Sequence, residues 1–301
     1  MPIPQAIPPN PDELEVSVFG PGFGESVVVH VGNGEWIIVD SCVDTLDGDP
    51  KSIEYLRLLG LDPAQCVKVV VATHWHDDHV AGLSKTLNDC ASALFCCPVA
   101  LSQRDFLRLA ELYCETSGDF PQGPEEIRKS IEIAGLRSKK LRKQMLCFAK
   151  SDSLVWESQS SQVKLIALSP SDEMIRRFIE SVAQQYAIAS SGMDIDDQLT
   201  ANTPNDTATA LRLDVAGRSV LLGSDLEKGS SLVGWSAVLT SNMGKEKNHL
   251  FSRWHIMAQN QGITMQFGQI CSSLSHGHSF LHSVGVAIVF LMQMIGSEYF
   301  L

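Results

Sequence analysis

A mostly apolar, β-branched segment, Val67 to Ala72, runs directly into Thr-His-Trp-His-Asp-Asp-His at positions 73–79. A short apolar run of this kind is typical of a strand that is buried on both faces of a sheet. The polar residues that follow must therefore lie in a loop at the end of a core strand. This junction constrains the fold strongly, because the rest of the chain has to enclose the strand and still leave the loop accessible.

The loop holds three histidines and an aspartate at the spacing H-x-H-x-D-H, namely His74, His76, Asp78 and His79. Imidazole nitrogens and carboxylate oxygens are ligands that zinc and similar divalent ions accept. Such a loop can direct His74 and His76 to one ion while Asp78 and His79 face a second. Any one of these residues alone could be an ordinary solvated loop residue. Several strongly hydrated groups packed together at a strand end, however, bring little structural benefit unless they bind an ion. The spacing therefore predicts a two-metal site.

The composition is that of an ordinary globular protein, with 301 residues of which 44% are hydrophobic and 19% charged. The formal net charge of -12 gives no general attraction for nucleic acid or an anionic membrane, so small molecules are the easier substrates. Positions 1–12 lack the features of a signal peptide, and the apolar stretch Val284 to Ile295 is too short to span a bilayer. We therefore expect a cytoplasmic protein without a membrane partner, with its eight cysteines as reduced thiols.

Hydrophobic periodicity predicts short strands and helices in alternation. Strands are expected at 14–19, 26–31, 36–39, 67–72 and 93–97, and helices at 52–59, 80–87 and 172–189. From 101 to 150 the pattern is helical, which we interpret as an inserted cap beside the site. A basic run near its end is either a solvated helix face or a phosphate-contacting surface. It comprises Arg137, Lys139, Lys140, Arg142 and Lys143.

A second informative block precedes Asp225. Thr207 to Val215 and Arg218 to Gly223 are strand-like and are separated by Ala216-Gly217, a hairpin signal. The second strand leads into Gly223-Ser224-Asp225 and so places an acidic side chain at a strand end. Asp225 is either a metal ligand or a turn-initiating aspartate. Positions 238–240 have the pattern of one more strand.

Taken together, these residues resemble the metallo-β-lactamase superfamily of binuclear metal hydrolases over residues 14–240. The loop matches the family's motif, Asp40 matches an aspartate that ends an early strand, and Asp225 matches the aspartate that bridges the ions. The resemblance implies an α/β fold, the αββα four-layer sandwich, holding two zinc ions or manganese or iron in their place. It also implies that Asp78 binds the second ion and acts in catalysis as a proton shuttle.

The departures from the family pattern indicate a particular branch. Most lactamases, glyoxalases and lactonases of this family have another ligand histidine before the bridging aspartate, but this chain has none from Val80 to Lys247. Its Pro204-Asn205-Asp206 segment, followed by the two strands, resembles the ComEC-type metallo-hydrolase domain of bacterial DNA-uptake channels. In that branch Asn205 or Asp206 would support the site near the ions. A late His-His-Gly-Ser motif, which supplies the last metal ligand there, is missing.

A change of reading frame at the start of the tail, near Leu250 to Ser252, would explain this absence. The body of the chain comprises a proline-rich segment at 1–13 and a metallo-β-lactamase-like domain at 14–250, whereas 251–301 lacks clear helix or strand patterns. Triplets read one base earlier across Ser252 to Asn260 permit Lys-Val-Ala-His-His-Gly-Ser-Glu. We therefore expect the tail to be frame-shifted. The alternative is a divergent protein in which His249 or His255 replaces the ligand.

The predicted function is metal-dependent hydrolysis by metal-activated water, with a phosphodiester or related ester as substrate. Hydrolysis of a small ester, lactone or β-lactam is the first alternative. A partner-binding pseudoenzyme is the second, because the late ligand motif is missing. The net charge does not favour nucleic acid as the partner, and the sequence leaves the oligomeric state open.

Overall fold

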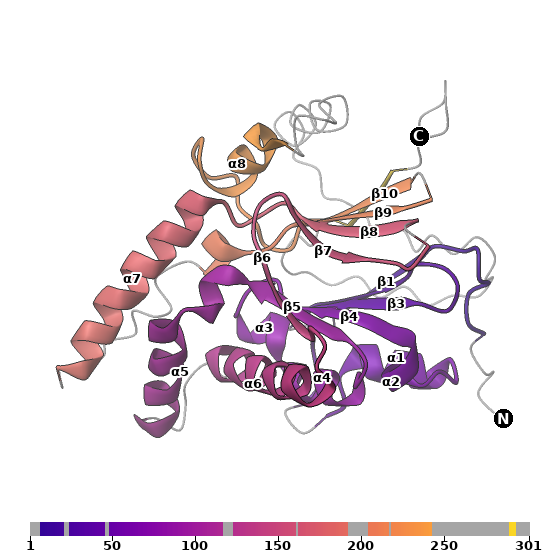
Figure 1. The fold of residues 1–301 in the computed structure, drawn as a ribbon, viewed down its shortest axis with the longest axis horizontal. Helices are drawn as coiled ribbons and strands as arrows, with labels where there is room; N and C mark the ends of the chain where they lie inside the picture. The colour runs from indigo at the N-terminus through magenta and orange to yellow at the C-terminus, as the bar shows by residue number, and fades with distance from the viewer. Residues whose placement is uncertain are drawn as a thin grey trace.

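A computed structural model describes residues 7–20, 24–45, 48–116, 123–160, 162–191, 204–216, 218–242 and 289–292. In this part of the chain two β-sheets pack face to face, and helices cover their outer sides (Figure 1). The first sheet has six strands in the order β1-β2-β3-β4-β5-β6, and the second has five in the order β11-β10-β9-β8-β7. The α/β class predicted from the sequence is confirmed.

The first sheet combines an antiparallel meander, β1 to β3, with parallel strands from β3 to β6. All residues of β2 and β3 are buried, because one face of the sheet meets the second sheet and the other meets helices. The strands are β1 (Glu15–Phe19), β2 (Ser26–His30), β3 (Trp36–Val39), β4 (Val67–Val71), β5 (Leu94–Pro98) and β6 (Leu146–Ala149). Because parallel strands end at one edge, the segments after β3 and β4 emerge side by side.

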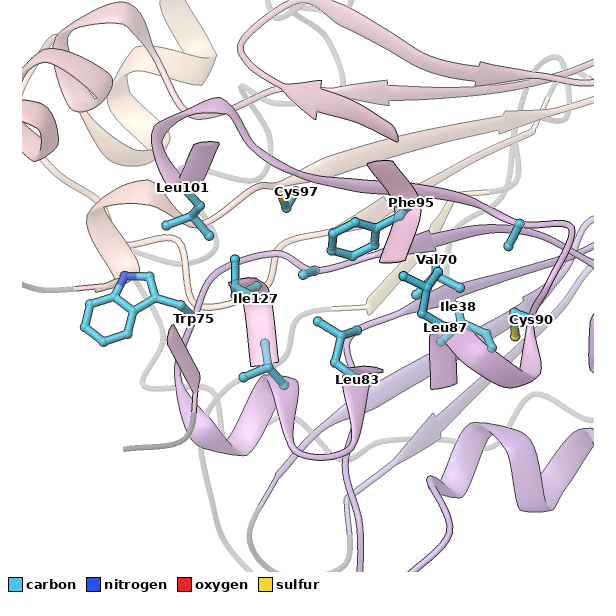
Figure 2. Close-up of a cluster of buried hydrophobic side chains, with 14 of the residues drawn as sticks. Ile38, Val70, Trp75, Leu83, Leu87, Cys90, Phe95, Cys97, Leu101 and Ile127 are labelled. Carbon is cyan, nitrogen blue, oxygen red and sulfur yellow. The ribbon is translucent and has the colours of Figure 1, made fainter. Parts of the chain in front are cut away.

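Helices cover the outer face of this sheet, and Figure 2 shows the core that lies between the helices and the sheet. Leu83 and Leu87 from one helix and Ile127 from another pack with Phe95 and Val70 of the sheet, and all five are fully buried. Full burial of such a side chain contributes about 1.5–3 kcal/mol. The helices are α1 (Lys51–Leu58), α2 (Pro63–Cys66), α3 (Asp77–Val80), α4 (Leu83–Asp89), α5 (Arg104–Thr116) and α6 (Gly123–Leu141), with a short 3-10 turn η1 (Val99–Ser102).

The second sheet is antiparallel throughout. Its outer side carries a smaller core in which Ile166 packs with Met174 and Val238 from two helices, which completes four layers. The strands are β7 (Ser153–Glu157), β8 (Val163–Ala167), β9 (Leu211–Val215), β10 (Arg218–Leu222) and β11 (Val289–Met292). The helices are α7 (Asp172–Ser190) and α8 (Gly234–Thr240), with a 3-10 turn η2 (Pro204–Thr207) before β9.

Three elements differ from the sequence predictions. The helix expected at 80–87 is two helices, because Gly82 has a φ of 74° and an added Cβ there would lie 2.9 Å from Val43 Cγ1. The strand expected at 238–240 is wrong: it is the end of α8, whose buried residues Gly234, Ala237 and Val238 recur at helical spacing. The helical region at 101–150 contains α5 and α6, but its last residues form strand β6.

The tail predicted at 251–301 lies outside the described residues except for β11, which pairs antiparallel with β10. Residues 192–203 and Gly217 of the Ala216-Gly217 hairpin lie outside them too. Six cysteines are described; all are free and five of them are buried. Among the described helices, none is long and apolar enough to cross a membrane.

Candidate metal centre

The candidate metal centre lies where the ends of three strands meet. Asp40 follows β3 and the histidine loop follows β4, and these two strands are parallel neighbours. The loop leads into α3, which carries Asp78 and His79. Asp225 approaches from the second sheet, shortly after β10. The fold therefore gathers at one edge side chains that are far apart in the sequence.

Two histidines and an aspartate form the first group. His74 Nε2 lies 3.0 Å from His76 Nδ1 and 4.0 Å from Asp225 Oδ2. Two donor atoms bound to one zinc ion at about 2.1 Å and tetrahedral angles would be about 3.4 Å apart. The observed separations lie on either side of that value, so this donor set fits one small divalent ion. Three protein donors with one position open are typical of catalytic zinc sites.

A second group uses the same oxygen of Asp225. His79 Nε2 lies 3.5 Å from Asp225 Oδ2 and 3.9 Å from Asp78 Oδ2. Asp225 Oδ2 therefore lies within 4.0 Å of both His74 Nε2 and His79 Nε2. The structure brings together all the residues that the sequence predicted as metal ligands, and it gives Asp225 the central place.

Asp40 belongs to the support of this centre. Its Oδ1 accepts a hydrogen bond from the Thr73 backbone N–H at 2.7 Å, and its Oδ2 accepts from the Thr73 hydroxyl at 2.7 Å. Oδ2 also lies 2.9 Å from His79 Nδ1. Asp40, His74 and His79 are close enough to hold an ion, but both carboxylate oxygens of Asp40 are already engaged. Asp40 therefore orients the ring of His79, with Nε2 directed to the second group.

The two buried histidines differ in charge. Burial, with neighbouring His79 and His76, holds the pKa of His74 well below its ordinary value, which keeps this ring in the neutral form that binds metal. Burial also disfavours charge on His79, but hydrogen bonds to Asp225 and Asp40 outweigh it and raise the pKa of His79 to about 11. The two carboxylates around His79 thus attract positive charge. A metal ion bound there would have to displace the proton.

The histidine loop is anchored to the helices by residues between the ligands. Trp75 is 3% exposed and its ring centroid lies 6.1 Å from that of Phe106 in α5. Asp77, which is not among the predicted ligands, accepts a hydrogen bond from the Gly123 N–H at 2.6 Å and so caps α6. Helix α6 is therefore part of the support of the metal loop. Sequence reasoning missed Asp77, because an aspartate beside a metal motif gives no sign of its tertiary partner.

Replacement of Gly123 by alanine should strain this anchor, because an added Cβ would lie 1.9 Å from the Trp75 carbonyl oxygen. We expect Gly123→Ala to reduce the free energy of unfolding by about 1–3 kcal/mol, the usual cost of overpacking. Gly135→Ala in the same helix is the matched control, since nothing lies within 4 Å of its Cβ. That change should stabilise by about 0.5–1 kcal/mol. Urea unfolding measures the free energy of unfolding of both variants. Equal changes in the two would contradict a role of Gly123 in anchoring the histidine loop.

Of Asn205 and Asp206, the two residues predicted to support the site near the ions, the structure describes the side chain of Asn205. The Asn205 side-chain N–H donates to Glu227 Oε1 at 3.4 Å, and its buried Oδ1 has no hydrogen-bond partner. The side chain of Asp206 lies outside what the structure describes. A role for either residue stays a prediction.

The basic run lies at the far end of α6 from the metal loop. Arg137 Nη2 donates to the Leu87 carbonyl at 2.8 Å and Nη1 donates to the Cys90 carbonyl at 3.4 Å, so Arg137 caps the end of α4. Lys139 and Lys140 are exposed, about 24 Å along the helix from Gly123 at 1.5 Å per residue. The solvated-face interpretation therefore accounts for this run, and a small substrate at the metal centre would not reach it.

Comparison with known proteins gives one family match. Residues 19–98 match the family model described as the metallo-beta-lactamase superfamily. This segment contains β2 to β5 and the whole histidine loop. No curated protein matches the chain.

Solved structures with similar folds are distant. A metallo-beta-lactamase from Cronobacter sakazakii is 15% identical with a TM-score of 0.39, and the match covers 82% of this chain and 75% of that one. A metallo-beta-lactamase-type protein from Thermotoga maritima is 17% identical with a TM-score of 0.32. The match covers 51% of this chain and 65% of that one, so this chain spans less than two thirds of that protein's length. A hydrolase of the beta lactamase superfamily is 18% identical with a TM-score of 0.30, covering 51% of this chain and 60% of that one.

All three TM-scores are below 0.5, so the similarity to the family rests on the matched segment and its motif. The α/β fold predicted from the sequence is confirmed, and the matched segment agrees with the predicted superfamily, whereas no comparison supports the ComEC-type branch. Residues 19–98, which carry the histidine loop, are similar to the metallo-beta-lactamase superfamily.

Proposed function

We propose that this chain is a metal-dependent hydrolase with a binuclear centre. The observation that carries the proposal is the position of Asp225 Oδ2, 4.0 Å from His74 Nε2 and 3.5 Å from His79 Nε2. A carboxylate oxygen shared by two imidazoles can bridge two ions. Mixed nitrogen and oxygen donors favour zinc, and manganese or iron would be accepted by the same set. A cytoplasmic location is part of the same proposal.

Each residue has a defined part in this scheme. His74 and His76 would hold the first ion, Asp78 and His79 the second, and Asp225 both. When bound, the ions would lower the pKa of water and neutralise negative charge at the reacting oxygens. The Asp78 side chain is 29% exposed, so it can exchange protons with solvent and serve as the proton shuttle. Asp40 would keep the ring of His79 fixed through the reaction.

The proposed substrate is a phosphodiester or a related ester, as the similarity to the ComEC-type branch implies. The basic run gives no support to this choice, because it lies far from the loop. A small ester, lactone or β-lactam is the alternative and uses the same chemistry. Salt dependence separates the two, since substrate binding through phosphate contacts weakens steeply with added salt and binding of a neutral ester does not.

The second alternative is a partner-binding protein without activity. It follows from the absence of the late ligand motif, whose expected place in the chain falls outside the described residues. A frame change near Leu250 to Ser252 would account for that loss, and independent sequencing of the locus from Thr240 to the stop tests it. An intact frame ending at Leu301 would leave His249 or His255 as the replacement ligand.

Hydrolysis assays test the proposal directly. We expect the zinc-loaded protein to cleave bis-nitrophenyl phosphate or a chromogenic lactam, and His76→Ala to lose this activity because the first group loses one of its three donors. Thr240→Ser, on the opposite side of the second sheet, is a control that should keep it. If the protein binds metal but hydrolyses neither substrate, both with the present sequence and with its frame restored, the result would contradict the proposed hydrolase activity and favour the partner-binding alternative.

A further inference from the structure

Ser224, immediately before Asp225, has a backbone conformation that serine rarely adopts. Its φ is 48°, in the left-handed region that glycine enters freely and that a Cβ makes unfavourable. A glycine would fit this turn without strain. The serine side chain must therefore make an interaction that offsets the unfavourable backbone, and its hydroxyl group shows which one.

The hydroxyl group of Ser224 joins the two segments that carry the ligands. It donates to Thr73 Oγ1 at 2.7 Å and lies 3.4 Å from His74 Nδ1. Thr73 belongs to the histidine loop of the first sheet, whereas Ser224 follows β10 of the second. This hydrogen bond therefore fixes the position of Asp225 relative to His74.

The same hydrogen bonds determine which nitrogen of His74 carries the proton. Thr73 has one hydroxyl hydrogen and donates it to Asp40 Oδ2. Thr73 Oγ1 can then only accept, from the Ser224 hydroxyl and from His74 Nδ1, which lies 3.0 Å away. His74 Nδ1 must carry the proton, and Nε2 is left with a free lone pair directed at His76 and Asp225. That is the form of the ring that binds a metal ion.

We propose that Ser224 is a positioning residue of the metal centre, whose hydroxyl group ties Asp225 to the histidine loop through Thr73, the residue that fixes the tautomer of His74. The inference rests on the proposed function, because it assigns His74 Nε2 to an ion. It predicts that replacement of serine by glycine lowers metal affinity without lowering stability. A residue that only supported the fold would not separate the two.

Ser224→Gly and Ser224→Ala test this, with Ala216→Gly as the matched control. Ala216 has a φ of 45° and is exposed in the hairpin after β9, so glycine relieves the same strain there without removing a hydroxyl group. We expect both glycine variants to keep or raise the melting temperature. Only Ser224→Gly should weaken zinc binding, by about tenfold or more, the usual effect of removing a hydrogen-bond partner of a ligand. Ser224→Ala should lower both stability and affinity.

The second measurement needs no metal. Crystal structures of the zinc-free proteins should keep the 4.0 Å separation between His74 Nε2 and Asp225 Oδ2 in Ala216→Gly and show it lengthened in Ser224→Gly. An unchanged separation and a zinc affinity within about twofold in Ser224→Gly would overturn the inference. If the parent binds no zinc, the proposed function fails, and the position of Asp225 alone still decides the role of Ser224.

Discussion

Asp225→Asn should remove the metal centre as a unit and reduce the bound zinc from two ions per chain to one or none. The reason is that one oxygen of Asp225 lies between the two groups of donors, 4.0 Å from His74 Nε2 and 3.5 Å from His79 Nε2. An amide keeps the size of the side chain but not the charge that two cations share. Hydrolysis should fall about a thousandfold, which corresponds to the several kcal/mol that metal ions supply to the transition state.

Two further variants make this result specific. Asp78→Asn should lose one ion and keep the other, because the Asp78 carboxylate belongs to the second group, with Oδ2 3.9 Å from His79 Nε2. Asp172→Asn, which changes an exposed acidic residue in the first turn of α7, should keep both ions. Elemental analysis after dialysis measures all three. Asp225→Asn protein that still holds two ions would show that the carboxylate does not bridge.

Asp40→Ala should be the most destabilising single change at the centre. Asp40 is 1% exposed and satisfies the backbone N–H and hydroxyl of Thr73 as well as His79 Nδ1. Alanine would leave these donors buried without partners, at about 1–3 kcal/mol for each. We expect a loss of about 3–5 kcal/mol in the free energy of unfolding, measured by urea unfolding of metal-free protein. Measurement without metal separates this loss from any loss of bound zinc.

Asp49→Ala is the control for Asp40→Ala, because Asp49 makes exposed ion pairs with Lys85 and Arg57. Pairs of this kind contribute about 0–1 kcal/mol. Loss of less than about 1 kcal/mol in Asp40→Ala would mean that water replaces the lost hydrogen bonds and that Asp40 does not organise the loop.

The ligands could be predicted from the sequence because local pattern and chemistry agree at each of them. A β-branched run identifies β4, and the residues that follow have ligand chemistry at a spacing that one loop can direct to an ion. Asp225 follows a hairpin pattern in the same way. Such positions need no knowledge of tertiary partners, since parallel strand ends meet at one sheet edge.

The residues that organise the ligands could not be found in this way. Thr73, Asp77 and Ser224 have ordinary polar side chains, and each acquires its role from a partner distant in the sequence or from a backbone angle. The end of α8 shows the same limit for secondary structure. Val238-Leu239-Thr240 has strand-like residues, but burial of Val238 against Ile166 and Leu168 favours the helix.

The central claim, that Asp225 joins two metal ions, is tested most directly by anomalous diffraction from crystals of zinc-loaded protein. The account predicts two zinc peaks per chain, one beside His74 and His76 and one beside Asp78 and His79, with Asp225 bound to both. A single peak, or two peaks of which Asp225 touches only one, would contradict it.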